Sequence, residues 1–273
     1  MTGRAGILVL VMAAVVVPWA AAATDPVAAI LDQARGTPVE IFADVVFRLI
    51  DAGKIAEKDR AALLDEVFLR ADGARQAIPV HPAAISSSYA NSADLHLDAL
   101  SIKCRVVRAM LEVDGKQARR LFSEIAPPRL PKPDCKESVL KDPTVYFDTL
   151  ASVATKAPFT VEEQKKQVAF WMMADAVRGI QTSIEIIAAA RNFSQHVHSE
   201  NEALAMSGAF AAALAIDDCD RNFSGALRSS NLEDAVLMAD DRFARLGAPP
   251  QPMQAALRGY LVRHLTATRC EDT

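Results

Sequence analysis

Apolar residues recur at three- and four-residue intervals through most of the chain after residue 24, which is the spacing of one buried face of an α-helix. A clear example begins at Phe42 and continues with Val45, Val46, Leu49 and Ile50. No window shows the sustained alternation of β-branched and polar residues that is typical of a strand. The pattern therefore predicts an all-α protein.

Several helix starts can be read from capping residues. Asp25 precedes Pro26 and a helical apolar pattern that ends at Gly36, which predicts a capped first helix. Four segments have a Ser or Thr followed three residues later by Glu, the arrangement of a capping box. These segments are Thr37–Glu40, Thr160–Glu163, Thr182–Glu185 and Ser199–Glu202.

The combined signals predict twelve helices separated by Gly- and Pro-containing turns. The expected ranges are 25–36, 37–53, 57–71, 93–113, 118–125, 142–153, 160–177, 182–190, 199–214, 219–227, 232–246 and 252–270. Residues 74–92 and the segment Pro127–Pro133 are expected to be irregular connections.

Successive helices joined by short turns predict an array of antiparallel helix pairs, either α-solenoid-like or an irregular helical bundle. The tetrapeptide Arg-Asn-Phe-Ser occurs at 191–194 and again at 221–224, but little else aligns in that thirty-residue register. No named repeat class is supported. We expect one helical domain over residues 24–273, with 24–133 and 134–273 as alternative halves.

The first 23 residues have the pattern of a signal peptide. Arg4 precedes an uninterrupted apolar run at 7–17, Pro18 ends the run, and Ala20–Ala23 offers small residues for cleavage. The sequence therefore predicts an exported protein, periplasmic or extracellular, with an uncleaved anchor as the alternative. No later stretch is long and apolar enough for a membrane span, so none is expected after cleavage.

Four cysteines suit an oxidising compartment: Cys104, Cys135, Cys219 and Cys270. Four allow three pairings, and we favour Cys104–Cys135 with Cys219–Cys270, because each pair would join neighbouring helical units. No two cysteines have the close spacing of a zinc site, so we expect structural disulfides.

Composition and charge exclude some classes of partner. The formal net charge is −4, from 30 basic and 34 acidic residues, so no strong basic excess points to nucleic acid. Three Tyr and two Trp are too few for an aromatic platform that stacks bases.

Sequence motifs for catalysis are absent: the chain contains no Gly-x-Ser-x-Gly, no phosphate-binding loop and no His-Glu-x-x-His. The best metal candidates are His196, His198 and Glu200, because a His-x-His pair next to a carboxylate can ligate zinc. The alternative is that Glu200 and Glu202 belong to a helix start, where acidic side chains suit the helix dipole. We therefore predict no metal and no cofactor.

Three other clusters favour structural explanations. Asp217, Asp218 and Asp220 flank Cys219 and are more typical of a helix cap than of paired catalytic acids. The segment Phe170–Met173 is expected to be buried on several sides. A basic stretch is expected to be a solvated helix face, and its members are Lys116, Arg119, Arg120, Arg129 and Lys132.

The chain resembles exported bacterial all-helical proteins that carry no assigned activity. The resemblance rests on the signal peptide, the hairpin ending in Ala126–Pro131, and the C-terminal Arg269–Asp272. It implies no chemistry. The leading hypothesis is a non-catalytic exported scaffold that binds another protein of the cell envelope. The alternative is a metal-dependent or small-ligand enzyme that uses the His196–Glu202 region.

Overall fold

The computed structural model describes residues 25–74, 96–128, 142–215 and 226–266. These residues form α-helices and two short 3₁₀ helices, with no strand among them, which confirms the all-α prediction. The α-helices are α1 (Pro26–Arg35), α2 (Val39–Asp51), α3 (Glu57–Arg70), α5 (Ala99–Leu111), α6 (Gly115–Ser123), α7 (Thr144–Lys156), α8 (Val161–Lys165), α9 (Val168–Arg178), α10 (Ser183–Phe193), α11 (Glu200–Leu214), α12 (Ala226–Arg245) and α13 (Gln251–Thr266). The 3₁₀ helices are η1 (Ala71–Gly73) and η3 (Ser194–His196).

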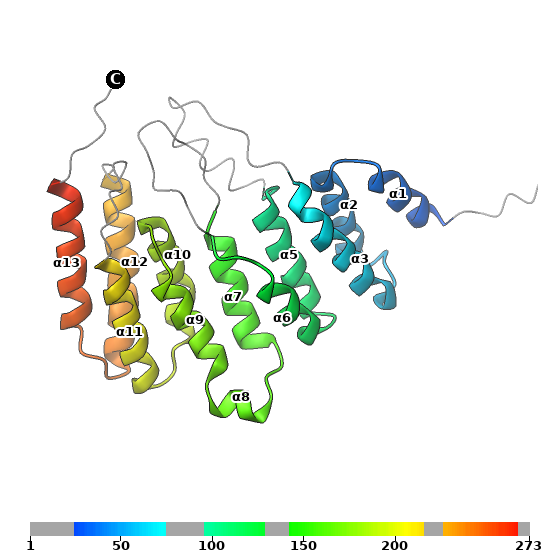
Figure 1. Cartoon of the computed structure of the whole chain (residues 1–273). Helices are drawn as coiled ribbons and strands as arrows, with labels where there is room; N and C mark the ends of the chain where they lie inside the picture. Colours follow the sequence, from blue (N-terminus) through cyan, green and yellow to red (C-terminus); the bar gives the residue numbers. More distant parts are fainter. Residues whose placement is uncertain (1–24, 75–95, 129–141, 216–225, 267–273) are drawn as a thin grey trace, which may run out of the picture.

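The helices from α5 onward form two layers of an elongated array (Figure 1). In one layer α5, α7, α10 and α12 pack side by side, and in the other α9, α11 and α13 do so. Helix α3 joins α1 and α2 to this array by packing against α5, and α8 lies at the lower edge of the array in Figure 1, below α7 and α9. The prediction of packed helix pairs is therefore confirmed.

One hydrophobic core runs through the whole array, from Leu31 on α1 to Tyr260 on α13. Its centre contains a chain of ring contacts that joins three helices. The Phe122 ring centroid on α6 lies 5.3 Å from that of Tyr146 on α7, and Phe147 lies 5.5 Å edge-on from Phe193 on α10. The neighbouring Tyr146 and Phe147 rings are also 5.5 Å apart. Aromatic packing thus ties successive helix pairs into one body.

Most of the predicted helix starts are confirmed. Asp25 accepts a 3.0 Å hydrogen bond from the Val27 backbone N–H. The boxes Thr160–Glu163 and Thr182–Glu185 are both present. The cap predicted at Thr37 is wrong, because the Thr37 hydroxyl donates instead to the Ala34 carbonyl at 2.7 Å, and α2 begins after Pro38. In the fourth box Ser199 caps Glu202, but the Glu202 carboxylate accepts from the His198 N–H.

Three predicted helix boundaries are wrong. Helix α5 begins at Ala99 rather than near 93, because Asp98 caps the Ser101 N–H at 3.1 Å and His96 has a positive φ of 46°. The predicted helix 160–177 is two helices, α8 and α9, separated at Gln167, whose φ is 52°. Residues 226–245 form one helix, whereas the pattern predicted two helices, 219–227 and 232–246, with a break between them.

The thirty-residue register of the Arg-Asn-Phe-Ser tetrapeptide is not the structural repeat. It aligns Asn201 on α11 with Asn231 on α12, which lie in different layers. The equivalent positions in the array are instead α10 with α12 and α11 with α13. The second copy of the tetrapeptide lies outside the described residues.

Cys104 is fully buried on α5, and among the described residues it has no disulfide partner. Burial raises the pKa of the Cys104 thiol to about 12, although a hydrogen bond with Thr149 on α7 opposes that shift. Cys135, Cys219 and Cys270 lie outside the described residues, as do residues 1–23. The signal peptide and both disulfides stay predictions.

Candidate functional site

The structure places the predicted metal candidates at the connection between α10 and α11 but does not gather them. The exposed His198 donates its backbone N–H to Glu202 Oε2 at 2.8 Å, so this carboxylate serves the helix start. The Glu200 side chain lies against the turn between α12 and α13, where its Cγ is 3.1 Å from a Cβ built at Gly247. His196 is partly buried, and burial, followed by the repulsion of His198, lowers its pKa.

A metal centre requires several ligands that converge on one point. Among the residues that the structure describes, no group of three or more His, Cys, Asp or Glu is placed to hold a metal ion. Asp217, Asp218 and Asp220, which could have extended the cluster, fall outside those residues. The arrangement at His196–Glu202 is explained by helix capping.

The predicted basic stretch does not form a free cationic patch over its described part. Arg119 is paired with Glu163 on α8, and Arg120 with Glu124, the residue that follows its own helix. Lys116 is exposed at the start of α6. Arg129 and Lys132 are not among the described residues. The pairing favours a structural role for the two arginines.

Arg119 links α6 to α8 through its ion pair with Glu163, and this pair makes the stability of the fold depend on pH. Its Nη1 donates to Glu163 Oε2 at 3.0 Å, and its guanidinium lies 4.4 Å from the centroid of the Phe159 ring. The hydrogen bond from Arg119, followed by that from the Thr160 backbone, lowers the pKa of Glu163 to about 2. A carboxylate with a lowered pKa stabilises the fold above its ordinary pKa of about 4.5, and the effect is lost as pH falls toward 2.

We therefore expect Arg119→Ala to lower the urea midpoint of unfolding at neutral pH. The difference in urea midpoint between this variant and the parent should become smaller as the pH is lowered through about 4.5 toward 2. Arg48→Ala is the control, because Arg48 forms a 2.7 Å pair with Asp44 on the exposed surface of α2 and should change the midpoint little at any pH. A difference for Arg119→Ala that is constant over this pH range would contradict the electrostatic explanation.

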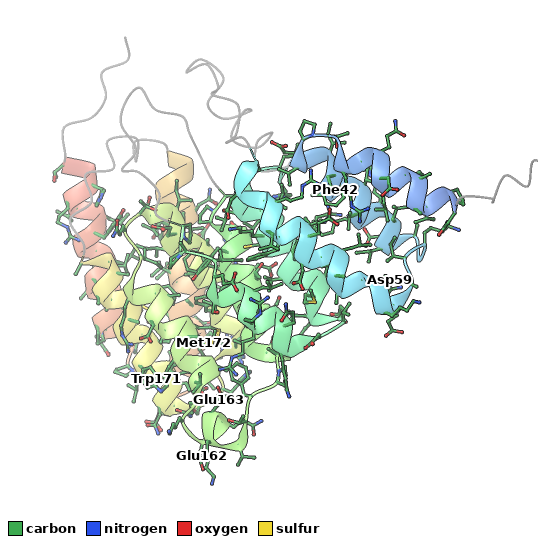
Figure 2. The ribbon with its side chains drawn as sticks, turned by 45° about the vertical axis from the view of Figure 1, so that its right-hand side comes forward. Phe42, Asp59, Glu162, Glu163, Trp171 and Met172 are labelled. Carbon is green, nitrogen blue, oxygen red and sulfur yellow. The ribbon has the colours of Figure 1, made fainter. Side chains whose placement is uncertain are left out.

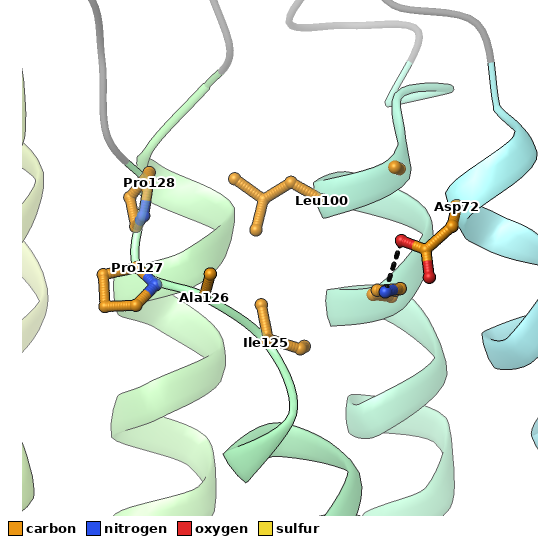
Figure 3. A pocket seen from close by; sticks show the side chains of 8 residues that line it. Asp72, Leu100, Ile125, Ala126, Pro127 and Pro128 are labelled. Carbon is orange, nitrogen blue, oxygen red and sulfur yellow. Dashed lines mark hydrogen bonds and ion pairs between the residues drawn. The ribbon is translucent and has the colours of Figure 1, made fainter.

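A hollow of about 310 Å³ lies between η1, the start of α5 and the segment after α6 (Figure 3). Its walls are mostly apolar, and its charged groups are Lys103 and Asp72. The Lys103 Nζ is 2.6 Å from Asp72 Oδ1 and 5.1 Å from the Phe68 ring centroid. The Lys103 cation therefore already has a carboxylate and a ring as partners. The lining residues are Asp72, Ala99, Leu100, Lys103, Ile125, Ala126, Pro127 and Pro128.

A different feature is an apolar surface on the outside of the second layer, whose part on α11 carries no charge over residues 203–214. Trp171 on α9 is 38% exposed and Leu204 on the neighbouring α11 is 42% exposed. Figure 2 shows Trp171 next to the half-buried Met172, above α8. Further along α11, Gly208 and Ala212 are also exposed. We call this surface, made of Trp171, Met172, Leu204, Gly208 and Ala212, the α9–α11 face.

The prediction for the segment Phe170–Met173 is partly wrong at this face. Phe170 and Met173 are buried, as expected, but the Trp171 ring reaches solvent. The Arg178 guanidinium lies 5.3 Å from the centroid of that ring and also forms an ion pair with Asp175, so the two charges beside Trp171 neutralise each other. The sequence signal for the rest of the face is the stretch 203–214, which contains no charged residue.

The outer side of the first layer is chemically different. Ion pairs and hydrogen bonds cross between its helices: Arg108 Nη1 lies 2.6 Å from Asp148 Oδ2, and Arg191 donates to Asn231 at 3.3 Å. Leu237 on α12 is 39% exposed, but it shares its helix with the exposed Asp234 and Asp241. Exposed apolar side chains also occur on other helices, but those of the α9–α11 face lie beside a helix stretch without charge, so this face is the candidate protein-binding surface.

The chain matches no family model, no curated protein and no solved structure. Within the described residues, no helix has both the length and the apolar composition needed to cross a membrane. The candidate site consequently rests on the geometry of the molecule.

Proposed function

We propose that this protein is an exported, non-catalytic helical scaffold whose α9–α11 face binds another macromolecule of the bacterial cell envelope. The observation that carries the proposal is the exposure of Trp171 and Leu204 on adjacent helices, beside a helix stretch without charge. Apolar surface of this kind marks interaction sites on folded proteins, because its removal from water favours association. The signal-peptide pattern of residues 1–23 supports the location.

The enzyme alternative has less support. The Glu202 carboxylate accepts the His198 backbone N–H at the start of α11, and the Glu200 side chain lies against the turn between α12 and α13. None of these residues lines the described hollow. A scaffold also agrees with the continuous core, which holds the helix pairs as one rigid support for a surface.

Photo-crosslinking tests the proposed surface directly. A benzoylphenylalanine residue placed at position 204 should give discrete adducts after irradiation, recovered from the envelope fraction of an exporting bacterial host. The same residue at position 237 is the matched control, because the two leucines are 42% and 39% exposed on opposite layers. Equal adducts at both positions, or none at position 204, would refute the proposal.

A further inference from the structure

Helix α11 can meet an identical helix without bringing like charges together. Its residues from Ala203 to Leu214 carry no charge, and its exposed Leu204 is apolar. In a two-fold symmetric interface the same patch supplies both sides, so the patch must be complementary to itself. An uncharged helix face satisfies this condition from Ala203 to Leu214.

The charges at the two ends of α11 are complementary when two copies run antiparallel. Glu200 begins the helix, and its side chain is exposed there. At the opposite end, Arg263 on α13 donates from Nη2 to the Leu214 carbonyl at 2.6 Å, which places a guanidinium beside the last residue of α11. A two-fold axis across the middle of α11 would bring Glu200 of each copy level with Arg263 of the other. Antiparallel helices also align their dipoles favourably.

Gly208, next to the middle of α11, has no structural requirement within the chain. Its φ is not in the left-handed region, and a Cβ built at this position has nothing within 4 Å. Glycine inside a helix costs about 1 kcal/mol relative to alanine. The fold alone does not explain it, whereas an absent side chain at the crossing point allows two helix backbones to approach closely.

We propose that the partner of the α9–α11 face is a second copy of this chain, joined by a two-fold axis that pairs α11 with α11 in antiparallel orientation. The proposal rests on the proposed function, because it names the partner of the same face. The dimer covers Trp171 and Leu204 of both copies and places the carboxylate of Glu200 against Arg263 at each end.

Sedimentation equilibrium of the exported protein tests this arrangement. The parent should be a dimer that dissociates on dilution, and Leu204→Arg should raise the dissociation constant at least about tenfold, because each copy would bury a guanidinium group in an apolar interface without a partner for its charge. Leu237→Arg places the same charge at a matched exposure on the other layer and should leave the dimer unchanged. A parent that stays monomeric, or equal weakening by both variants, would overturn the proposal.

A charge swap tests the antiparallel register. Glu200→Arg and Arg263→Glu should each weaken self-association, because each places like charges at both ends of the interface. An equimolar mixture of the two variants should recover association, since a heterodimer has opposite charges at both ends. Circular dichroism verifies that each variant is folded before mixing. Failure of the mixture to associate more strongly than either variant alone rejects this register.

The two proposals can fail separately. Adducts from position 204 that contain a different protein, together with a monomeric parent, overturn the dimer and leave the scaffold function standing. Adducts with twice the mass of the chain, abolished by Arg263→Glu, support the dimer. Absence of adducts from position 204 together with a monomeric parent removes both.

Discussion

Phe193→Ala is expected to lower the free energy of unfolding by about 3–5 kcal/mol. Phe193 ends α10, has no exposed surface, and packs edge-on against Phe147 on α7. Its removal deletes the ring contact that joins α7 to α10. The surrounding helices are held by their own neighbours and cannot collapse fully into the space, so a cavity would remain. Urea unfolding followed by circular dichroism measures the loss.

The control for this substitution is Leu69→Ala on α3, where the side chain is 74% exposed. That change should alter the free energy of unfolding by less than about 0.5 kcal/mol. A loss of similar size at both positions would show that the aromatic chain is not the part of the core that holds α7 to α10.

Secondary structure was predictable here because helical periodicity and capping are local. The Thr182–Glu185 box is present as predicted, since both halves of the motif lie within one turn. The break at Gln167 was not predictable in the same way. No Gly or Pro within residues 160–177 marks it, and the turn depends on α8 being held by Arg119, which is distant in sequence. The Thr37 cap failed because its hydroxyl had a competing acceptor at the end of the preceding helix.

The candidate site was only partly predictable from sequence. The lack of charge over 203–214 is visible in the letters, but the side of α11 that stays exposed depends on the positions of α9 and α13. His196 and His198 were metal candidates because imidazoles next to carboxylates can ligate zinc. In the structure the neighbouring Glu202 accepts a hydrogen bond at the start of α11, and Glu200 lies against the turn between α12 and α13. Convergence in space, which sequence does not contain, separates the two explanations.

Gly115→Ala is expected to destabilise the protein by about 1–3 kcal/mol, although alanine is the better helix former. Gly115 is the first residue of α6, and a Cβ there would lie 2.7 Å from Cδ of Pro158, in the connection between α7 and α8. A proline ring cannot rotate away as a flexible side chain can, so the backbone of one segment would have to move. That connection also precedes the cap of α8, so the movement should disturb the contact between Arg119 and Glu163. Thermal unfolding followed by circular dichroism measures the effect.

Alanine is not expected to destabilise the protein at Gly73, the last residue of η1. An added Cβ there would have nothing within 4 Å. Gly73→Ala restricts the unfolded chain without a clash, and it should be neutral or stabilise the protein by up to about 1 kcal/mol. The pair of variants therefore separates the conformational effect of losing a glycine from the steric effect of a close approach. If Gly115→Ala were as stable as Gly73→Ala, the close contact between the start of α6 and Pro158 would have to be wrong.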